Sequence, residues 1–247
     1  MPVALMIEGQ EGVTWPQWCA TANHVSGGRI ELGLGAGWME REHRAFGFPF
    51  PETAERLAMF AEQLELVHRL WTEPRVDFHG AHYTFEDAPA LPKPVQQPHP
   101  PLLVGSRGTR GTADPAVRFA DEYNTPFASP DEFAAVRAKV VRACERGGRD
   151  PATMRFSLRT GCLIGTTRDE ALERARQLYT GAPRDVDFDT WLAALSERAI
   201  VGSVDEAAER LRAYAQVGCE RVMLQHLLHD DLEPVRLIGR SLAPAVS

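Results

Sequence analysis

Residues 29–38, RIELGLGAGW, decide the fold of this chain. The first part of this stretch predicts a buried strand. Gly33, Gly35 and Gly37 then stand at alternate positions ahead of Trp38, and glycines placed in this way suit a backbone that another group approaches closely. Two interpretations stay open here, namely a floor for a flat aromatic ring and a tight corner of a barrel.

The flanking segments predict strands and helices in alternation. On the N-terminal side, a short apolar run at residues 3–7 predicts a strand, and a helix capped by Thr14 ends at Ser26, Gly27 and Gly28. On the C-terminal side, residues 51–73 carry apolar side chains at spacings of three and four, which predicts a long amphipathic helix.

Residues 76–85 alternate around a glycine turn, which predicts a hairpin. The proline-rich stretch 91–101 then predicts an ordered connector or a linker. After it the chain returns to alternating strands and helices. We expect strands at 101–105, 122–125, 155–165 and 220–224, and helices near 114–121, 130–146, 168–178, 189–198, 204–217 and 233–242. Buried strands that alternate with amphipathic helices predict an α/β fold with a parallel sheet. Six sheet strands are expected, whereas a closed barrel has eight. No repeat divides the chain, so we expect one domain over residues 1–247.

The composition excludes several classes of protein. Apolar residues make up 44% and charged residues 25% of the chain, which is typical of a packed globular protein and not of a disordered one. The formal net charge of −7 disfavours nucleic acid and anionic lipid as partners. The four cysteines lack a metal-binding spacing, and no apolar stretch approaches the roughly 18 residues of a membrane span. We therefore expect a cytoplasmic protein that acts without a membrane.

The loop after the third predicted strand is a candidate anion site. It begins with Gly105, Ser106 and Arg107, and it runs into the helix expected near Asp114. Backbone N–H groups at a helix start, together with two guanidinium groups, suit a phosphate. A solvated loop of turn-forming residues is the alternative. The earlier glycine cluster lacks the spacing of a dinucleotide fingerprint, and no Walker loop is present.

The histidines are weaker candidates. His43 follows Glu42 just beyond the glycine-rich stretch and could transfer protons, although an exposed pair on a helix is the alternative. His226 and His229 precede two aspartates, but no third ligand stands at a metal-binding spacing, so we expect no metal. The sequence signals of serine hydrolases and zinc proteases are absent.

Several motifs stand in an order that carries a family resemblance. They are VSGGRIELGLGAGW (25–38), EHRAFG (42–47), PFP (49–51), RLWTE (69–73), LPKPVQ (91–96), HPP (99–101), VG (104–105), ADEYN (120–124) and VGS (201–203). In sequence and order these motifs resemble the bacterial luciferase-like flavin-dependent oxidoreductases, above all the deazaflavin-dependent branch. The resemblance covers nearly the whole chain from about Ala20.

The resemblance implies a TIM-barrel-like (β/α)8 fold with an excursion between strands, and a cofactor, either coenzyme F-420 (a deazaflavin) or FMN, at the C-terminal mouth of the barrel. It implies a position for each candidate residue. Gly35, Gly37 and Trp38 would line the cofactor, Gly105, Ser106 and Arg107 would receive its phosphate, Asn124 would follow the next strand, and Glu8 would face the pocket as a catalytic residue beside His43.

The chain departs from the family pattern near Cys19. Where the family has two or more βα units after the first strand, this chain passes directly to the helix before residues 26–28. The missing segment would supply acid–base groups and two strands, which leaves an incomplete barrel with exposed edges. Such edges favour association, so we expect a homo-oligomer.

Three hypotheses for the function follow from the resemblance. The first is an oxidoreductase that transfers a hydride between coenzyme F-420 and a small organic substrate. The second is an FMN-dependent luciferase-like monooxygenase. The third is an incomplete, non-catalytic barrel that needs a partner or self-association. The residues do not identify the substrate.

Overall fold

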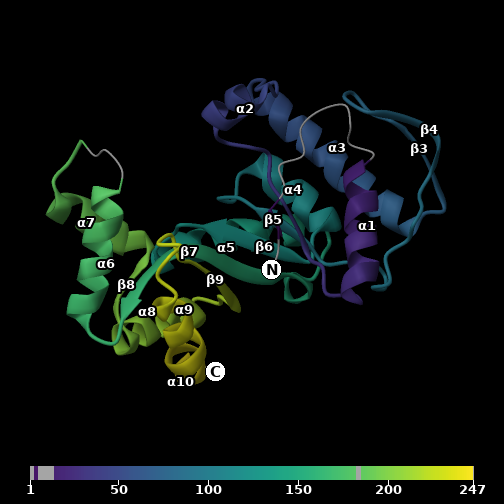
Figure 1. Cartoon of the computed structure of the whole chain (residues 1–247). Helices are drawn as coiled ribbons and strands as arrows, with labels where there is room; N and C mark the ends of the chain where they lie inside the picture. Colours follow the sequence, from purple (N-terminus) through teal and green to yellow (C-terminus); the bar gives the residue numbers. More distant parts are fainter. Residues whose placement is uncertain (1–2, 5–13, 182–184, 247) are drawn as a thin grey trace. The chain divides into compact units, whose positions relative to one another are not determined.

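The computed structural model describes residues 3–4, 14–181 and 185–246 (Figure 1). The backbone divides into two compact units, Met1–Tyr123 with Lys139–Arg155, and Asn124–Ala138 with Phe156–Ser247. The division falls within strand β6 (Glu122–Pro126) and within helix α5 (Pro130–Arg146). We call these the first and the second unit. The single domain expected from the sequence stays a prediction.

Three parallel strands form the sheet of the first unit. Strand β2 (Leu32–Leu34) lies between β1 (Val3–Ala4) and β5 (Leu102–Gly105), with Gly33 opposite Leu103. The first three residues of β5 are all buried, as expected of a parallel strand that is covered on both faces. The parallel sheet predicted for this part of the chain is confirmed.

The long helix of the first unit buries the apolar stripe that the sequence predicts. The unit contains several helices. They are α1 (Thr14–Ser26), α2 (Glu40–Phe46), α3 (Thr53–Thr72) and α4 (Arg110–Phe119), together with the second half of α5. On α3, Phe60, Leu64, Val67 and Leu70 are buried, and this helix packs on α1 and α4. Burying such a stripe is what stabilises a helix of this length in a protein.

The predicted hairpin is present beside α3, and one carboxylate fixes its turn (Figure 1). Strands β3 (Arg75–His79) and β4 (Thr84–Pro89) pair antiparallel. The Glu62 carboxylate accepts three backbone N–H bonds from the turn, from Ala81, His82 and Tyr83, at 2.7, 3.0 and 3.1 Å. A Cβ atom on Gly80 would clash with the same carboxylate. A side chain at this position would therefore displace the carboxylate that holds the turn.

The proline-rich connector is ordered by Asn23, a residue of α1. The Asn23 side chain is fully buried, and its oxygen accepts the backbone N–H groups of Val95 and Gln96 at 2.8 and 3.2 Å. Its amide nitrogen donates to the side chain of Gln96. Of the two possibilities that the sequence left open for this stretch, the structure thus shows the ordered connector.

The last residues of the connector hold a pH-sensitive contact with α3. The ring of His68 meets His99 edge-on at 5.1 Å and lies 5.5 Å from Phe119. Burial and the neighbouring His99 lower the pKa of His68, although the carboxylates of Asp121, Glu73 and Glu65 act in the opposite direction. The folded chain therefore resists protonation of this ring.

We expect stability to fall as the pH drops below about 6.5, the ordinary pKa of histidine. The unfolded chain binds a proton at His68 more readily than the folded chain does. The free energy of unfolding is therefore highest above the pKa that His68 has in the unfolded chain, and it decreases as the pH falls below that value. Urea unfolding at about pH 7.5 and about pH 5.5 measures the change. The variant His68→Gln should show a smaller change than the wild type, and the exposed control His229→Gln should not. An equal change in His68→Gln and wild type would rule out this residue as the source.

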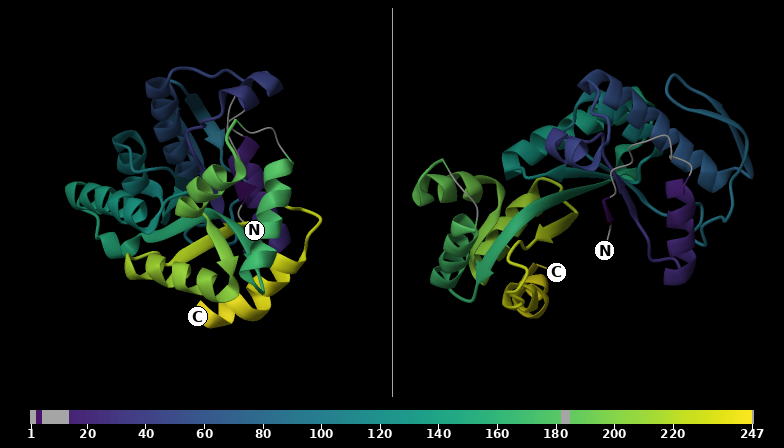
Figure 2. Two further views of the ribbon diagram at one scale, coloured as in Figure 1. Left: turned by 90° about the vertical axis from the view of Figure 1, so that its left-hand side faces the viewer. Right: turned by 45° about the horizontal axis from the view of Figure 1, so that its top comes forward.

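One long strand organises the second unit. Strand β7 (Arg155–Gly165) pairs in parallel with β9 (Arg221–Gln225) along Ser157–Gly161, and with β8 (Ile200–Ser203) along Cys162–Gly165. The helices of this unit are α6 (Arg168–Thr180), α7 (Phe188–Arg198), α8 (Val204–Gln216) and α9 (Glu233–Leu237), then a π-helical turn (Ile238–Leu242) and α10 (Ala243–Val246). The C-terminal turns lie against α8 (Figure 2), and Leu242 is buried in the same core as Leu211.

Two expectations about the elements need correction. The six predicted strands correspond to β1, β2, β5, β6, β7 and β9, but β8 is an additional strand that pairs with the far half of β7. In addition, α4 begins at Arg110 and not near Asp114. An aspartate followed by proline is typical of a helix start, but here Pro115 lies inside the helix. The helix begins earlier because the backbone N–H groups of Thr112 and Ala113 donate to the Thr109 carbonyl and form its first turn.

Candidate functional site

The structure brings the two glycine-rich segments together at the ends of β2 and β5. A Cβ atom on Gly35 would lie 3.4 Å from the carbonyl oxygen of Gly105, whereas one on Gly33 would meet nothing within 4 Å. Gly37 has a φ of 70°, a left-handed conformation that favours glycine, and the following Trp38 is 74% exposed. The close approach predicted for this stretch is therefore one between two backbones, with open space beside Gly33.

A network of hydroxyl groups shapes the loop that begins at Gly105. The Thr112 hydroxyl lies 2.9 Å from Ser106 Oγ and 3.1 Å from the Tyr123 hydroxyl. The backbone N–H of Gly108, a residue with φ 72°, donates to the same Tyr123 hydroxyl at 3.0 Å. Tyr123 is fully buried and Thr112 is 4% exposed. Buried hydroxyl groups of this kind fix the backbone of the loop.

This loop has the chemistry of an anion site. It leads directly into the first turn of α4, and the N-terminal end of a helix carries unsatisfied N–H groups and a partial positive charge. Ser106 is half-buried and Arg107 is exposed, so a ligand can reach both. Such a loop suits a phosphate group.

Sequence reasoning missed Tyr123, although it belongs to the ADEYN motif. It stands in β6 one residue before Asn124, and neighbouring residues of a strand point to opposite faces. A tyrosine next to the candidate on the same strand was therefore a usable signal. The role of Tyr123 in holding the loop, however, depends on its hydrogen bonds with Gly108 and Thr112, which are 15 and 11 residues away in the sequence.

Asn124 is described with the second unit, and its side chain already has buried partners. Its amide nitrogen donates to Ser157 Oγ at 2.8 Å and lies 3.9 Å from the sulfur of Met223. The residue is 8% exposed. Its cofactor-binding role stays a prediction.

Of the two residues expected to be catalytic, the structure describes only His43. Glu8 lies outside the described residues. His43 is 1% exposed, its Nδ1 donates to the Met39 carbonyl at 2.8 Å, and its ring meets Phe50 edge-on at 4.6 Å. These contacts describe a buried packing residue of α2, not the exposed helix pair that the sequence suggested, and proton transfer by His43 stays a prediction.

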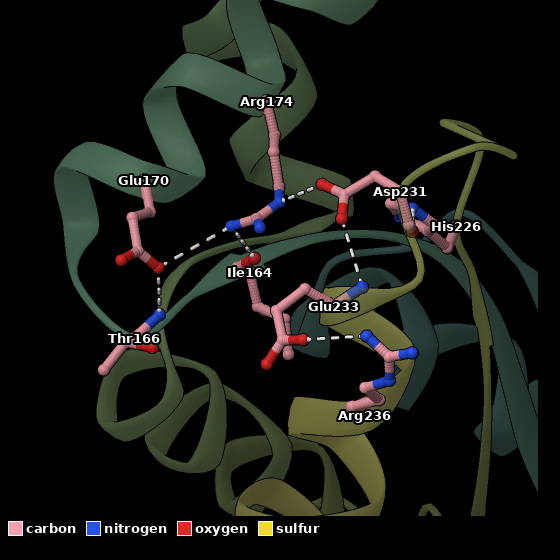
Figure 3. Close-up of polar contacts among 8 residues, drawn as sticks. All are labelled: Ile164, Thr166, Glu170, Arg174, His226, Asp231, Glu233 and Arg236. Atoms are coloured by element: carbon pink, nitrogen blue, oxygen red, sulfur yellow. Dashed lines mark hydrogen bonds and ion pairs between the residues drawn. The ribbon is translucent and has the colours of Figure 1, made fainter.

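The ends of β7 and β9 carry a second polar cluster (Figure 3). Arg174 of α6 donates to the Asp231 carboxylate at 2.6 Å and to the Ile164 carbonyl at 3.1 Å. Burial raises the pKa of Asp231, but hydrogen bonds from Arg174 and the Glu233 N–H, with the charge of Arg174, together hold it below its usual range. This ion pair fixes the segment after β9 to α6.

His226 belongs to this cluster. Its Nε2 donates to the Asp231 carbonyl at 2.8 Å, because a carbonyl can only accept. Its Nδ1 is buried and has no hydrogen-bond partner among the described residues. Within residues 3–4, 14–181 and 185–246, no three His, Cys, Asp or Glu side chains are grouped so that they could hold a metal ion.

Neither the cysteines nor the helices add a reactive thiol or a membrane segment to the described part of the chain. All four cysteines are buried free thiols, and burial raises the pKa of Cys19 to about 11 and that of Cys162 to about 12. A thiol with so high a pKa is a poor nucleophile. Throughout the described part of the chain, every helix is too short or too polar to cross a membrane.

Comparisons with known proteins agree with the fold. In structure the chain is similar to an F-420-dependent secondary alcohol dehydrogenase in complex with an F-420–acetone adduct, with a TM-score of 0.82 and 20% identity over 100% of this chain and 78% of that one. The fold is thus the TIM-barrel-like α/β fold of these enzymes.

Two curated relatives are similar in sequence. The FMNH2-dependent dimethylsulfone monooxygenase of Pseudomonas putida is 25% identical over 92% of this chain and 68% of its own length. The F-420-dependent glucose-6-phosphate dehydrogenase of Nakamurella multipartita is 25% identical over 91% of this chain and 70% of its own length. The chain thus spans about two thirds of the length of these relatives, which are enzymes. Residues 16–221 match the model of one protein family, and by this match the chain belongs to the luciferase-like monooxygenases.

Proposed function

We propose that this protein is an oxidoreductase that transfers a hydride between coenzyme F-420 and a small organic substrate. The observation that carries the proposal is the loop after β5, whose backbone is held by the buried Tyr123 hydroxyl while Ser106 and Arg107 stay accessible. Relatives that use F-420 support the choice of cofactor. The homo-oligomer expected from the sequence stays a prediction.

The residues of the first unit fit a phosphorylated cofactor. The backbone of Gly105, the Ser106 hydroxyl and the Arg107 guanidinium would receive the phosphate. Gly35 and Gly37 would border the cofactor beside the open face of Gly33, and Trp38 would cover it from an exposed position. When bound, the deazaflavin supplies a carbon centre that accepts or donates a hydride. The protein contributes position and exclusion of water.

A second candidate function is an FMN-dependent monooxygenase. The dimethylsulfone monooxygenase, which aligns over most of this chain, supports it. The same loop would receive the phosphate of FMN, so the two candidates differ in the cofactor and not in the place where it binds.

Titration of the purified protein with each cofactor, followed by fluorescence, tests both candidates. We expect F-420 to bind more tightly than FMN. The variant Tyr123→Phe should bind either cofactor about tenfold more weakly, which corresponds to a loss of about 1–2 kcal/mol of binding free energy. The reason is that the Gly108 N–H loses its hydrogen-bond partner and the loop loses its shape. The control Tyr214→Phe removes an equally buried hydroxyl, which donates to the Ala128 carbonyl instead, and should keep the wild-type affinity.

The remaining outcomes are equally informative. Tighter binding of FMN would replace the first candidate by the second. Binding of neither cofactor by the folded wild-type protein would overturn both. Equal losses in the two tyrosine variants would show that the loop does not bind the phosphate.

A further inference from the structure

Thr112 is the central member of the hydroxyl network beneath the candidate phosphate loop. It is the third residue of α4, and 4% of it is exposed. Its hydroxyl oxygen lies within 3.1 Å of the hydroxyl oxygens of Ser106, Thr109 and Tyr123. The direction of each of these hydrogen bonds decides what the loop can offer to a ligand.

The bond between Tyr123 and Thr112 has a direction that can be worked out from the partners of Tyr123. A hydroxyl group carries one hydrogen to donate and two lone pairs that accept. The Tyr123 oxygen already accepts the N–H of Gly108 at 3.0 Å. Tyr123 is fully buried, and within the described residues the Thr112 oxygen is the acceptor that its hydrogen reaches, at 3.1 Å. The Tyr123 hydroxyl therefore donates to Thr112.

The hydrogen of Thr112 in turn goes to Ser106. The Thr109 carbonyl also lies 3.0 Å from the Thr112 hydroxyl. Its two lone pairs are occupied, because it already accepts the backbone N–H groups of Thr112 and Ala113 at 3.1 and 2.8 Å. The hydroxyl of the exposed Thr109 can donate to the second lone pair of Thr112. Ser106 Oγ, at 2.9 Å, then accepts from Thr112.

These directions make the Ser106 hydroxyl a donor toward a ligand. Ser106 is half-buried, and among the described residues its hydroxyl bonds to Thr112 alone. A hydroxyl that accepts a hydrogen bond donates a stronger one, because the bonds of such a chain polarise one another. An ionised phosphate oxygen can only accept, and a bond to a charged acceptor is about twice as strong as a neutral one. The hydrogen of Ser106 thus suits a phosphate.

We propose that Thr112 is a positioning residue of the phosphate loop. It keeps the Ser106 hydroxyl in the donor role, and the loop thereby selects ligands that carry a phosphate. The inference rests on the proposed function and deepens it, because it names the chemical class that the loop accepts. A flavin side chain without phosphate ends in a neutral hydroxyl, which gains less from this donor. Without the Thr112 hydroxyl, Ser106 can turn and accept, so the selection weakens.

Fluorescence titration with matched pairs of ligands tests this role. F-420 is compared with its deazaflavin chromophore without phosphate, and FMN is compared with riboflavin. The variant Thr112→Val keeps the shape of threonine and removes the hydroxyl, whereas Thr112→Ser keeps the hydroxyl. The control Thr160→Val removes a buried hydroxyl of the second unit, which donates to the Arg198 carbonyl.

We expect Thr112→Val to bind the phosphorylated ligand about fivefold more weakly and the phosphate-free ligand as the wild type does. The variants Thr112→Ser and Thr160→Val should keep the wild-type affinities for both. An equal loss for both ligands in Thr112→Val would overturn the proposal, because a change in packing alone would have that effect. An equal loss in Thr112→Ser and Thr112→Val would overturn it as well, since the hydroxyl would not be the cause.

A double-variant cycle separates a role through Ser106 from a general role in the shape of the loop. In the Ser106→Ala background, Thr112 has no serine hydroxyl to direct. Adding Thr112→Val should then weaken binding of the phosphorylated ligand by less than about twofold. A further fivefold loss in this background would contradict the proposal, because the two residues would act independently.

Failure of the proposed function would give a different result. If the wild type bound the phosphorylated ligands no more tightly than the phosphate-free ones, the loop would not be a phosphate site, and the role of Thr112 would fall with it. If the wild type preferred the phosphorylated ligand and Thr112→Val kept the full preference, the role of Thr112 alone would be overturned.

Discussion

Replacing Asn23 by alanine is expected to lower the free energy of unfolding by about 2–5 kcal/mol. Asn23 is fully buried, and the substitution leaves the N–H groups of Val95 and Gln96 without their acceptor. Each of these part-buried donors costs at most about 1–3 kcal/mol when it loses its partner, and the volume of the lost amide adds a cavity. The connector then loses the bonds of Asn23 to Val95 and Gln96, whereas the bond between His24 of α1 and the Lys93 carbonyl stays.

Urea unfolding followed by circular dichroism measures this loss. The matched control is Thr21→Ala in the same helix, whose exposed hydroxyl only bonds the carbonyl of Gln17 and whose removal should change stability by at most about 0.5 kcal/mol. Equal stabilities of Asn23→Ala and Thr21→Ala would show that Asn23 does not hold the connector.

The variant Gly165→Ala is expected to lose about 2–3 kcal/mol of stability through overpacking. A Cβ atom at this position would lie 2.5 Å from the Cβ of Glu170, 2.7 Å from the Thr167 carbonyl oxygen and 2.9 Å from the Ala171 nitrogen. Two of these atoms are backbone at the start of α6, so no change of side-chain rotamer relieves the contact. The strand or the helix must shift.

Gly161→Ala in the same strand is the control. Its Cβ atom would lie 3.5 Å from the Cβ of Ala199, an ordinary contact. We expect a change below about 1 kcal/mol for this variant, measured by thermal and urea unfolding together. If both glycine variants were equally stable, β7 and α6 would have to be packed less closely than described.

Most of the elements could be predicted because their signals are local. The apolar stripe of α3 repeats within 20 residues, and a stripe of that length has one stable arrangement. Strand β7 was predicted with its full bounds, Arg155–Gly165, because it is a long run between two clear helices. Strand β8, with only four residues, IVGS, offers no comparable pattern, and its pairing with the far half of β7 is what makes it a strand.

The candidate site was predicted only in part. Gly105, Ser106 and Arg107 are contiguous and follow a strand, so their place in the fold could be read from the sequence. The contact between Gly35 and Gly105 joins segments 70 positions apart, and it required the register of β2 with β5. The supporting role of Tyr123 depends on its bonds to Gly108 and Thr112, which lie 15 and 11 residues away, and so it required the tertiary structure.

The sequence by itself determined the α/β class, the order of the main elements, the hairpin and the family resemblance, because each of these depends on neighbours within a few turns of chain. Only the tertiary structure decided how those elements serve a site. It placed Tyr123 under the loop at Gly108 and buried His43 against Phe50. Such contacts depend on which faces of distant elements meet, and that is decided by packing over the whole unit and not by the local pattern of residues.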